Sequence, residues 1–301
     1  MTTRRARRAW ALAALAALPL GACATTKREP WVLTTRGLEE RPVRDLKRIS
    51  TYPQALATTL DVMQHDLGLP AVQVQLIFLP DPRRLSELLV RAGHPPKLAR
   101  QAARELTAIG GQRTVLVNQT RLESEGWPGR VSILAHELGH VLQYELSGGK
   151  RETSAQWLRE GFSKWLELRV MEMLGGLERE KFWSQALERV RHPVGAPVLT
   201  LGGPRSLARR IERDPRVRLP ALRDLDSFSA WVEQLRGPAG GALYEYSFVA
   251  AATLIEDHDL PAVLRYFELF AIQKDAAANF HEAFGQSEEK FEERLQRVVW
   301  P

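Results

Sequence analysis

The motif His136-Glu137-Leu138-Gly139-His140 carries the clearest chemistry in the chain. Two histidines four residues apart stand one above the other on the same face of a helix. Both imidazoles can therefore reach one zinc ion at about 2.0–2.1 Å. Glu137 follows the first histidine, so its side chain emerges beside the metal, where it can take a proton from zinc-bound water. The motif predicts metal ligands at His136 and His140 and a general base at Glu137.

A third protein ligand is needed, because catalytic zinc commonly has three such ligands plus water, and two histidines with one glutamate are a known set. Glu160, in the segment Trp157–Phe162 (WLREGF), follows His140 by twenty residues. That length allows one helix to end at Ser147–Gly149 and a second helix to return alongside it. The only cysteine is Cys23, so histidine and carboxylate side chains must hold any metal.

The pairing of HELGH with WLREGF resembles the gluzincin metallopeptidases, and most of all the peptidase-MA-like bacterial proteins. The resemblance implies a zincin-like fold, one Zn²⁺ held by His136, His140 and Glu160, and general base catalysis by Glu137. It also implies that a peptide substrate adds as a strand to a sheet edge just upstream of the zinc helix. We expect that edge at Thr114–Asn118; the alternative is a core strand without substrate contact.

Further site residues follow from the same resemblance. Tyr244 matches the tyrosine of a downstream Tyr-x-x-Ser helix and is the expected oxyanion donor, with Tyr246 second; the alternative is a tyrosine packed in a helical core. A zinc-bound imidazole normally gives its other N–H to a carboxylate or carbonyl, for which Glu145 and Glu167 are candidates. Lys164 stands where thermolysin-like enzymes place an acidic residue, and the aminopeptidase signature GAMEN is absent, so neither branch is indicated.

Hydrophobic periodicity defines the elements that must position these residues. Alternating, branched residues predict strands over Ala71–Leu79 and Thr114–Asn118. Helical spacing predicts helices over 52–67, 82–92, 96–108, 131–146, 154–174, 228–236, 241–257, 260–272 and 287–299. The predicted fold class is α+β and mostly helical, with a small mixed sheet followed by a helical C-terminal part.

The predicted peptidase domain covers residues 51–301. It divides into an α/β part over 51–176, which holds the zinc helices, and a helical part over 177–301. Prolines, glycines and arginines gather at 193–220, which indicates an insertion or flexible loop in the second part.

The N-terminal residues have the pattern of a targeting segment. Residues 1–22 have a basic start, an apolar run too short to span a hydrocarbon core of about 30 Å, and small residues at the end, which predicts a signal peptide. Leu20–Cys23 resembles the lipobox of bacterial lipoproteins, which implies lipidation of Cys23 and, with Ala24 next, an outer-membrane location facing the periplasm. The alternative is a plain secretory signal. Residues 23–50 are expected to form a tether.

Charge excludes one class of partner. Of the 42 lysines and arginines, four precede Cys23 and none of the 36 acidic residues does, so the rest of the chain is nearly neutral. A nucleic-acid partner therefore has no electrostatic support. The leading interpretation is a zinc peptidase that acts on peptides or proteins at the cell envelope. The alternatives are a non-catalytic lipoprotein whose zinc site braces a partner-binding scaffold, and a binding domain without metal.

Overall fold

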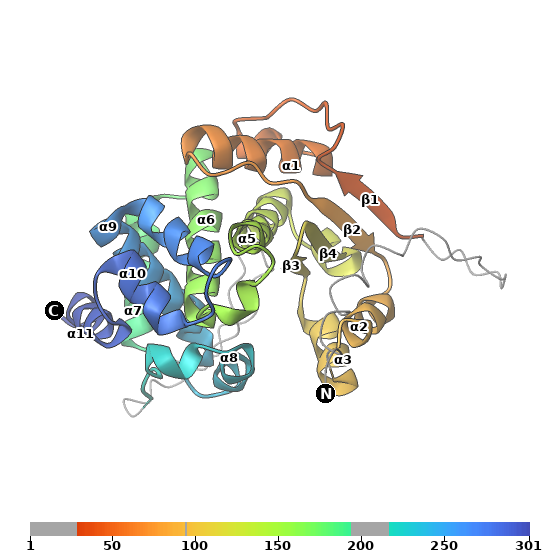
Figure 1. The fold of residues 1–301 in the computed structure, drawn as a ribbon. Coiled ribbons are helices and arrows are strands. Elements are labelled where there is room, and N and C mark those ends of the chain that lie inside the picture. The colour runs from red at the N-terminus through yellow and green to blue at the C-terminus, as the bar shows by residue number, and fades with distance from the viewer. Residues whose placement is uncertain (1–28, 94, 194–216) are drawn as a thin grey trace.

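The computed structural model describes residues 29–93, 95–193 and 217–301. These form an α+β fold that is mostly helical, as predicted (Figure 1). The predicted signal peptide, the lipidation site Cys23 and nearly all of the 193–220 insertion lie outside the described residues. Among the described helices, none has the length and apolar character needed to cross a bilayer.

A four-stranded sheet occupies the N-terminal half. Its strands are β1 (Trp31–Thr34), β2 (Gln75–Leu79), β3 (Ala108–Gly111) and β4 (Thr114–Asn118). Their order is β1-β2-β4-β3, with β2 and β4 parallel and both outer pairs antiparallel, which confirms the predicted mixed sheet. The expectation that Thr114–Asn118 forms an edge is wrong, because β4 lies between β2 and β3. The edge strand on that side is β3.

Alternation along the strands divides the sheet into two faces. Leu76 and Phe78 of β2 belong to the main core, whereas Leu79 belongs to a smaller cluster with Leu85 and Leu89 of α2. Helices α2 (Pro82–Arg91) and α3 (Pro96–Glu105) cover this second face. The other face meets α1 (Tyr52–Asp61) and α5 (Trp127–Leu146) (Figure 1). The sheet thus fixes the position of α5, which carries the first motif.

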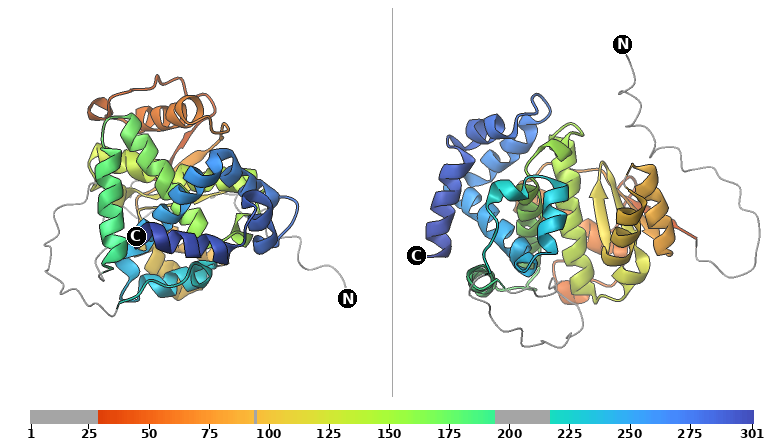
Figure 2. Two further views of the ribbon diagram at one scale, coloured as in Figure 1. Left: turned by 90° about the vertical axis from the view of Figure 1, so that its left-hand side faces the viewer. Right: turned by 90° about the horizontal axis from the view of Figure 1, so that it is seen from below.

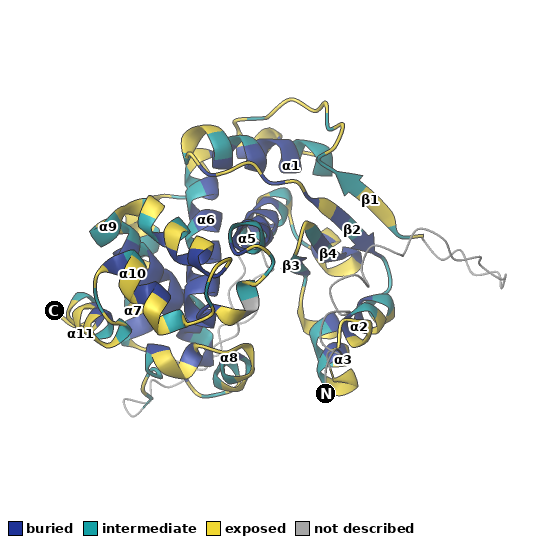
Figure 3. Ribbon diagram, viewed as in Figure 1, coloured by how far each residue is buried: buried dark blue, intermediate teal, exposed yellow. Residues whose placement is uncertain are grey.

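Helix α6 (Gln156–Met173), which carries the second motif, packs between α5 and α9 (Leu243–Leu269). The view from below shows α5 and α6 between the sheet and the C-terminal helices (Figure 2), and α6 is buried along most of its length (Figure 3). The remaining helices are α4 (Gln119–Glu123), α7 (Arg179–Arg191), α8 (Phe228–Leu235), α10 (Ala276–Phe284) and α11 (Glu288–Val299). Short helices are η1 (Leu46–Arg48), η2 (Val62–Asp66), η3 (Arg151–Thr153), η4 (Leu222–Leu225) and η5 (Gly240–Ala242).

The long helix α9 is two helical segments joined at Asp259, where the sequence predicts a break between 257 and 260. Asp259 has φ of 70° and ψ of 169°, and Pro261 follows. Its Oδ1 accepts a hydrogen bond of 3.0 Å from the N–H of Ala262, so it caps the second segment. The predicted division is confirmed.

Part of the predicted tether over residues 23–50 belongs to the fold. Trp31 lies in β1, and its ring stacks on that of Phe78 with centroids 3.8 Å apart. Leu46 and Ile49 are 4% and 2% exposed. The tether prediction is therefore wrong for residues 31–34 and 46–49, because a four-residue strand and one helical turn are too short to produce a clear periodicity.

The glycines of the two motifs allow the helices to approach closely. A Cβ added to Gly139 of α5 would lie 2.7 Å from Ser163 Oγ and 3.0 Å from its Cα on α6. A Cβ added to Gly161 of α6 would overlap the carbonyl oxygen of Ser247 on α9 and lie 2.7 Å from the carbonyl carbon. Gly139 lies between the two histidines and Gly161 directly follows Glu160. Neither carries a side chain that would separate the helices.

We expect Gly161→Ala to lower the free energy of unfolding by about 1–3 kcal/mol, because the new methyl group meets backbone of α9 that cannot rotate away. Urea unfolding of both proteins measures the change. Gly126→Ala is the control, since its Cβ would make only an ordinary 3.8 Å contact with Pro128. A Gly161→Ala protein as stable as the wild type would contradict the close contact.

A second prediction concerns Glu288, at the start of α11. Its Oε1 accepts a hydrogen bond of 2.8 Å from Trp157 Nε1, and burial together with the charge of Asp226 raises the pKa of Glu288 to about 8. The folded state therefore binds a proton that the unfolded chain releases above its ordinary pKa of 4.5. Protonated Glu288 therefore contributes fully to stability below pH 4.5, and this contribution is lost as the pH rises through about 8.

Glu288→Gln removes the titration and keeps an acceptor for Trp157. We expect the stability of the wild type to fall, relative to this variant, by about 1–3 kcal/mol between pH 5 and pH 8.5. Denaturant unfolding at several pH values measures the difference. Glu293→Gln, at an exposed position on the same helix, is the control and should follow the wild type. Parallel curves for wild type and Glu288→Gln would contradict the burial of this carboxyl group.

Candidate metal centre

The structure brings the three predicted ligands together. His136 and His140 lie on α5, and Glu160 lies on α6, which returns alongside it. Glu160 Oε2 lies 3.4 Å from His136 Nε2 and 3.6 Å from His140 Nε2. One possible ligand atom from each of His136, His140 and Glu160 lies within 4.8 Å of the other two. Both imidazoles therefore turn the same nitrogen, Nε2, towards one carboxylate oxygen.

The spacing of these atoms fits a zinc ion. Ligand atoms about 2.0–2.1 Å from a tetrahedral ion are about 3.3–3.4 Å apart. The two distances to Glu160 Oε2, 3.4 and 3.6 Å, are close to that value. Two imidazole nitrogens and a carboxylate oxygen are a usual donor set for zinc. The donor set and the two distances to Glu160 thus fit a three-ligand zinc site.

The other nitrogen of His136 faces a second carboxylate. His136 Nδ1 lies 3.4 Å from Glu167 Oε2. Glu167 Oε1 accepts hydrogen bonds from Ser132 Oγ at 2.6 Å and Lys164 Nζ at 2.8 Å. Of the two candidate carboxylates, Glu167 therefore orients the imidazole. Glu145 instead pairs with Arg113 at the surface, 2.7 Å apart.

His140 is oriented by neutral groups. Its Nδ1 lies 3.1 Å from Gln143 Oε1 and 3.1 Å from Ser163 Oγ. The amide of Gln143 also donates to the backbone carbonyl of Arg159 at 2.8 Å, which ties the imidazole of α5 to α6. Gln143 and Ser163 were not predicted as partners of His140. Only their positions could have indicated this role, since each lies three residues after a candidate ligand on the same helix face.

The electrostatics of the group keep its two carboxylates ionised. Burial lowers the pKa of His136, but its contacts with Glu160 and Glu167 outweigh burial and raise the pKa to about 10. Burial raises the pKa of Glu160, yet the two histidines hold it well below its usual range. Burial likewise raises the pKa of Glu167, while Lys164 and His136 lower it to about 2. Glu160 and Glu167 are therefore ionised, and the positive charges of His136 and Lys164 balance them.

Glu137, the predicted general base, lies between the metal ligands and the edge strand. Its Oε2 accepts a hydrogen bond from the N–H of Gly110 in β3, and the residue is 8% exposed. A Cβ added to Gly110 would lie 2.5 Å from the backbone oxygen of Glu137 and 2.8 Å from His140 Cβ. Only glycine lets β3 come this close to α5.

The side of β3 that faces away from β4 lies beside this group. The N–H of Asn118 in β4 donates to the carbonyl of Thr107 at 2.9 Å, so Thr107 faces β4. Backbone groups alternate in an antiparallel pair, and those of Ala108 and Gly110 therefore face away from β4. The carbonyl of Gly110 accepts a 3.3 Å hydrogen bond from Arg151 Nη1. Ala108 is the other outward-facing residue of this edge.

Tyr244 lies beside the ligands. Its ring centroid is 6.3 Å from that of His136 and 5.2 Å from that of Trp231. Burial, followed by the charge of Glu160, raises the pKa of Tyr244, so its hydroxyl stays protonated and remains a donor. Tyr246 is fully buried and faces the glutamates of α11. The two tyrosines therefore have different surroundings, and only Tyr244 adjoins the metal group.

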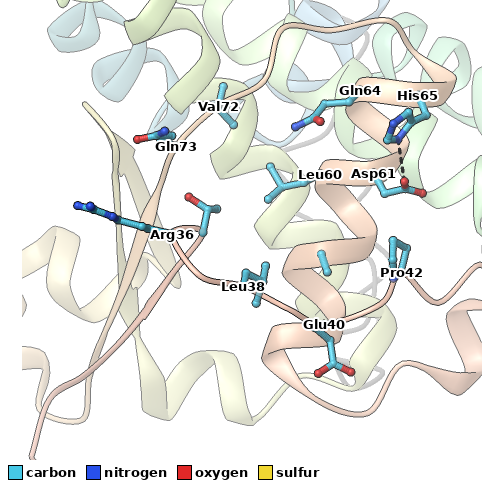
Figure 4. A pocket seen from close by; sticks show the side chains of 12 residues that line it. Arg36, Leu38, Glu40, Pro42, Leu60, Asp61, Gln64, His65, Val72 and Gln73 are labelled. Carbon is cyan, nitrogen blue, oxygen red and sulfur yellow. Dashed lines mark ion pairs between the residues drawn. The ribbon is translucent and has the colours of Figure 1, made fainter.

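A well-defined cavity lies away from this group. A hollow of about 370 Å³ opens between the segment after β1, helix α1 and η2 (Figure 4). Asp61 and His65 form an ion pair of 2.7 Å on its wall. None of the residues of the metal group lines it. This cavity therefore takes no part in the zinc site.

Comparison with protein-family models, with curated proteins and with solved structures finds no match to this chain. Any function assigned to the protein therefore depends on the geometry of the site itself.

Proposed function

We propose that the protein is a zinc-dependent peptidase of the gluzincin type with a zincin-like fold. The observation that supports this most is the convergence of His136, His140 and Glu160. Their candidate ligand atoms all lie within 4.8 Å of one another, and Glu160 Oε2 is 3.4 and 3.6 Å from the two Nε2 atoms. Three protein ligands leave one position for water or substrate, which is typical of catalytic zinc sites. Glu137 adjoins this group without belonging to it.

Zinc bound there supplies Lewis-acid chemistry, since it polarises a peptide carbonyl and makes water more acidic. The hydrogen bond from Gly110 uses Glu137 Oε2, so we assign proton transfer to Oε1. Glu137 Oε1 takes the proton of the attacking water and then passes it to the leaving amine. The hydroxyl of Tyr244 donates to the oxyanion that forms at the attacked carbonyl.

The substrate in this proposal is a peptide or protein segment in extended form. It adds as a further strand along the side of β3 that faces away from β4, where the backbone groups of Ala108 point. The envelope location and the lipid anchor on Cys23 belong to the same proposal, supported by the N-terminal sequence.

One observation favours a second candidate, in which the zinc site braces a non-catalytic scaffold. His140 and Glu160 are only 7% and 8% exposed, and the base Glu137 already accepts a hydrogen bond from Gly110. A structural zinc site normally has four protein ligands, and this group provides three. The ligand count therefore favours the peptidase.

Purified mature protein distinguishes the two candidates. We expect one zinc ion per chain by elemental mass spectrometry and cleavage of a mixed peptide library, detected by peptide mass spectrometry. Treatment with a chelator should abolish cleavage, and added zinc should restore it. One zinc per chain without cleavage would favour the brace, and absence of bound zinc would exclude both candidates.

A further inference from the structure

We propose that Gln156, oriented by Arg159, holds Glu160 as a ligand that binds zinc through one oxygen only. This inference rests on the zinc site of the proposed function and adds two positioning residues to it. Neither residue touches the reacting atoms. Both act through Glu160, the ligand supplied by α6.

The two oxygens of Glu160 have different surroundings. Oε2 faces the Nε2 atoms of His136 and His140, at 3.4 and 3.6 Å. Oε1 accepts a 2.5 Å hydrogen bond from Gln156 Nε2, one helical turn earlier on α6. Gln156 and Glu160 are 4% and 8% exposed, so water competes little for this bond. Oε1 is thereby turned away from the position of the ion.

Arg159 fixes which end of the Gln156 amide faces Glu160. Its Nη2 donates to Gln156 Oε1, and Arg159 is 1% exposed. A guanidinium has only donors, so it can pair with the amide only through the oxygen. The amide nitrogen must then face the carboxylate. A flipped amide would place oxygen against oxygen and nitrogen against guanidinium, which costs both hydrogen bonds.

Arg159 also helps to orient His140. Its backbone carbonyl accepts the hydrogen bond from Gln143 Nε2, and Gln143 Oε1 lies against His140 Nδ1. The side chain of Arg159 thus orients Glu160 through Gln156, while its main chain orients His140 through Gln143. Two ligands on different helices depend on one buried residue.

The hydrogen bond from Gln156 thus limits how many oxygens of Glu160 are available to bind the metal. A carboxylate that binds through both oxygens adds a ligand and crowds the position that water needs at a catalytic zinc. The hydrogen bond from Gln156 competes for Oε1 and so favours a single Glu160–metal bond. Groups that orient ligands in this way typically change metal affinity by about 10–100-fold when they are removed.

Gln156→Met tests the proposal, because methionine keeps the length of the side chain and cannot donate to Glu160. We expect its zinc dissociation constant to rise about 10–100-fold. We also expect the visible absorption of the Co²⁺-substituted protein to weaken, since cobalt absorbs more strongly with four ligands than with five or six. Gln119→Met is a matched control: Gln119 is 7% exposed and donates to Glu123 at 2.6 Å, also four residues on.

The outcomes separate this inference from the proposed function. A wild type that binds neither zinc nor Co²⁺ would overturn the zinc site itself. A wild type that binds both, with a Gln156→Met protein of equal affinity and identical spectrum, would overturn only the role of Gln156. A variant that loses thermal stability while its Co²⁺ spectrum is unchanged would have the same meaning. If Gln156→Met fails to fold, Gln156→Asn provides the test, since its amide is too short to reach Oε1.

Discussion

Glu137→Gln is expected to bind one zinc ion per chain, as the wild type does, and to cleave peptides about 10²–10⁴-fold more slowly. Glu137 is not among the three metal ligands, so its replacement leaves the donor set intact. Glutamine keeps an oxygen that can accept the hydrogen bond from Gly110, and it preserves the packing of β3 on α5. Its amide cannot take the proton of the attacking water.

Zinc content by elemental mass spectrometry and kcat/KM on a peptide found in the library measure the two parts of this prediction. Glu145→Gln is the control, because Glu145 lies on the same helix and pairs with Arg113 at the surface. It should leave both quantities unchanged. A zinc-loaded Glu137→Gln protein with undiminished cleavage would refute the assignment of the general base.

Glu160→Ala should lose the metal. With His136 and His140 alone, the site has two protein ligands, one fewer than catalytic zinc commonly has. We expect the zinc dissociation constant to rise by at least about 100-fold, more than the loss of an orienting group produces. Two buried imidazoles would also lose their anionic partner, so the variant should be less stable with zinc present than the wild type.

Competition with a chromophoric chelator measures the affinity, and thermal unfolding with and without zinc measures the linked stability. Glu172→Ala is a control on the same helix, since Glu172 pairs with Arg169 three residues away and contacts no ligand. Equal zinc stoichiometry in the wild type and in Glu160→Ala would show that the third ligand is misassigned.

Much of the fold could be predicted from the sequence, because hydrophobic residues recur at helical spacing along the length of α5, α6 and α9. The break at Asp259 was also predictable from the proline two residues later. Strand β3 was not predictable, since Ala108–Gly111 includes two glycines and strands are depleted in glycine. The glycine that conceals the strand is also the one that lets it contact Glu137. The sheet edge was therefore assigned to the wrong strand.

The three candidate ligands could be identified from residue type and spacing, whereas Gln143 and Gln156, which contact them, could not. Histidine and glutamate at metal-binding intervals form a recognisable pattern. Gln143 and Gln156 form none, because glutamine is common on helices and its role depends on what lies across from it. Helix geometry would have separated the two candidate carboxylates. Glu167 is seven residues after Glu160 and shares its face, whereas Glu145 is nine residues after His136 and lies opposite.

The contact between Gly139 and Ser163 places the backbones of α5 and α6 against each other with almost no side chain between them. The distance between these helices also sets the distance between the imidazoles and the carboxylate. A substitution that separates the helices by a few tenths of an ångström changes both distances between the imidazoles and the carboxylate at once, while most of the core adjusts with little loss. Zinc affinity should therefore reveal small displacements in this region before thermal unfolding detects them.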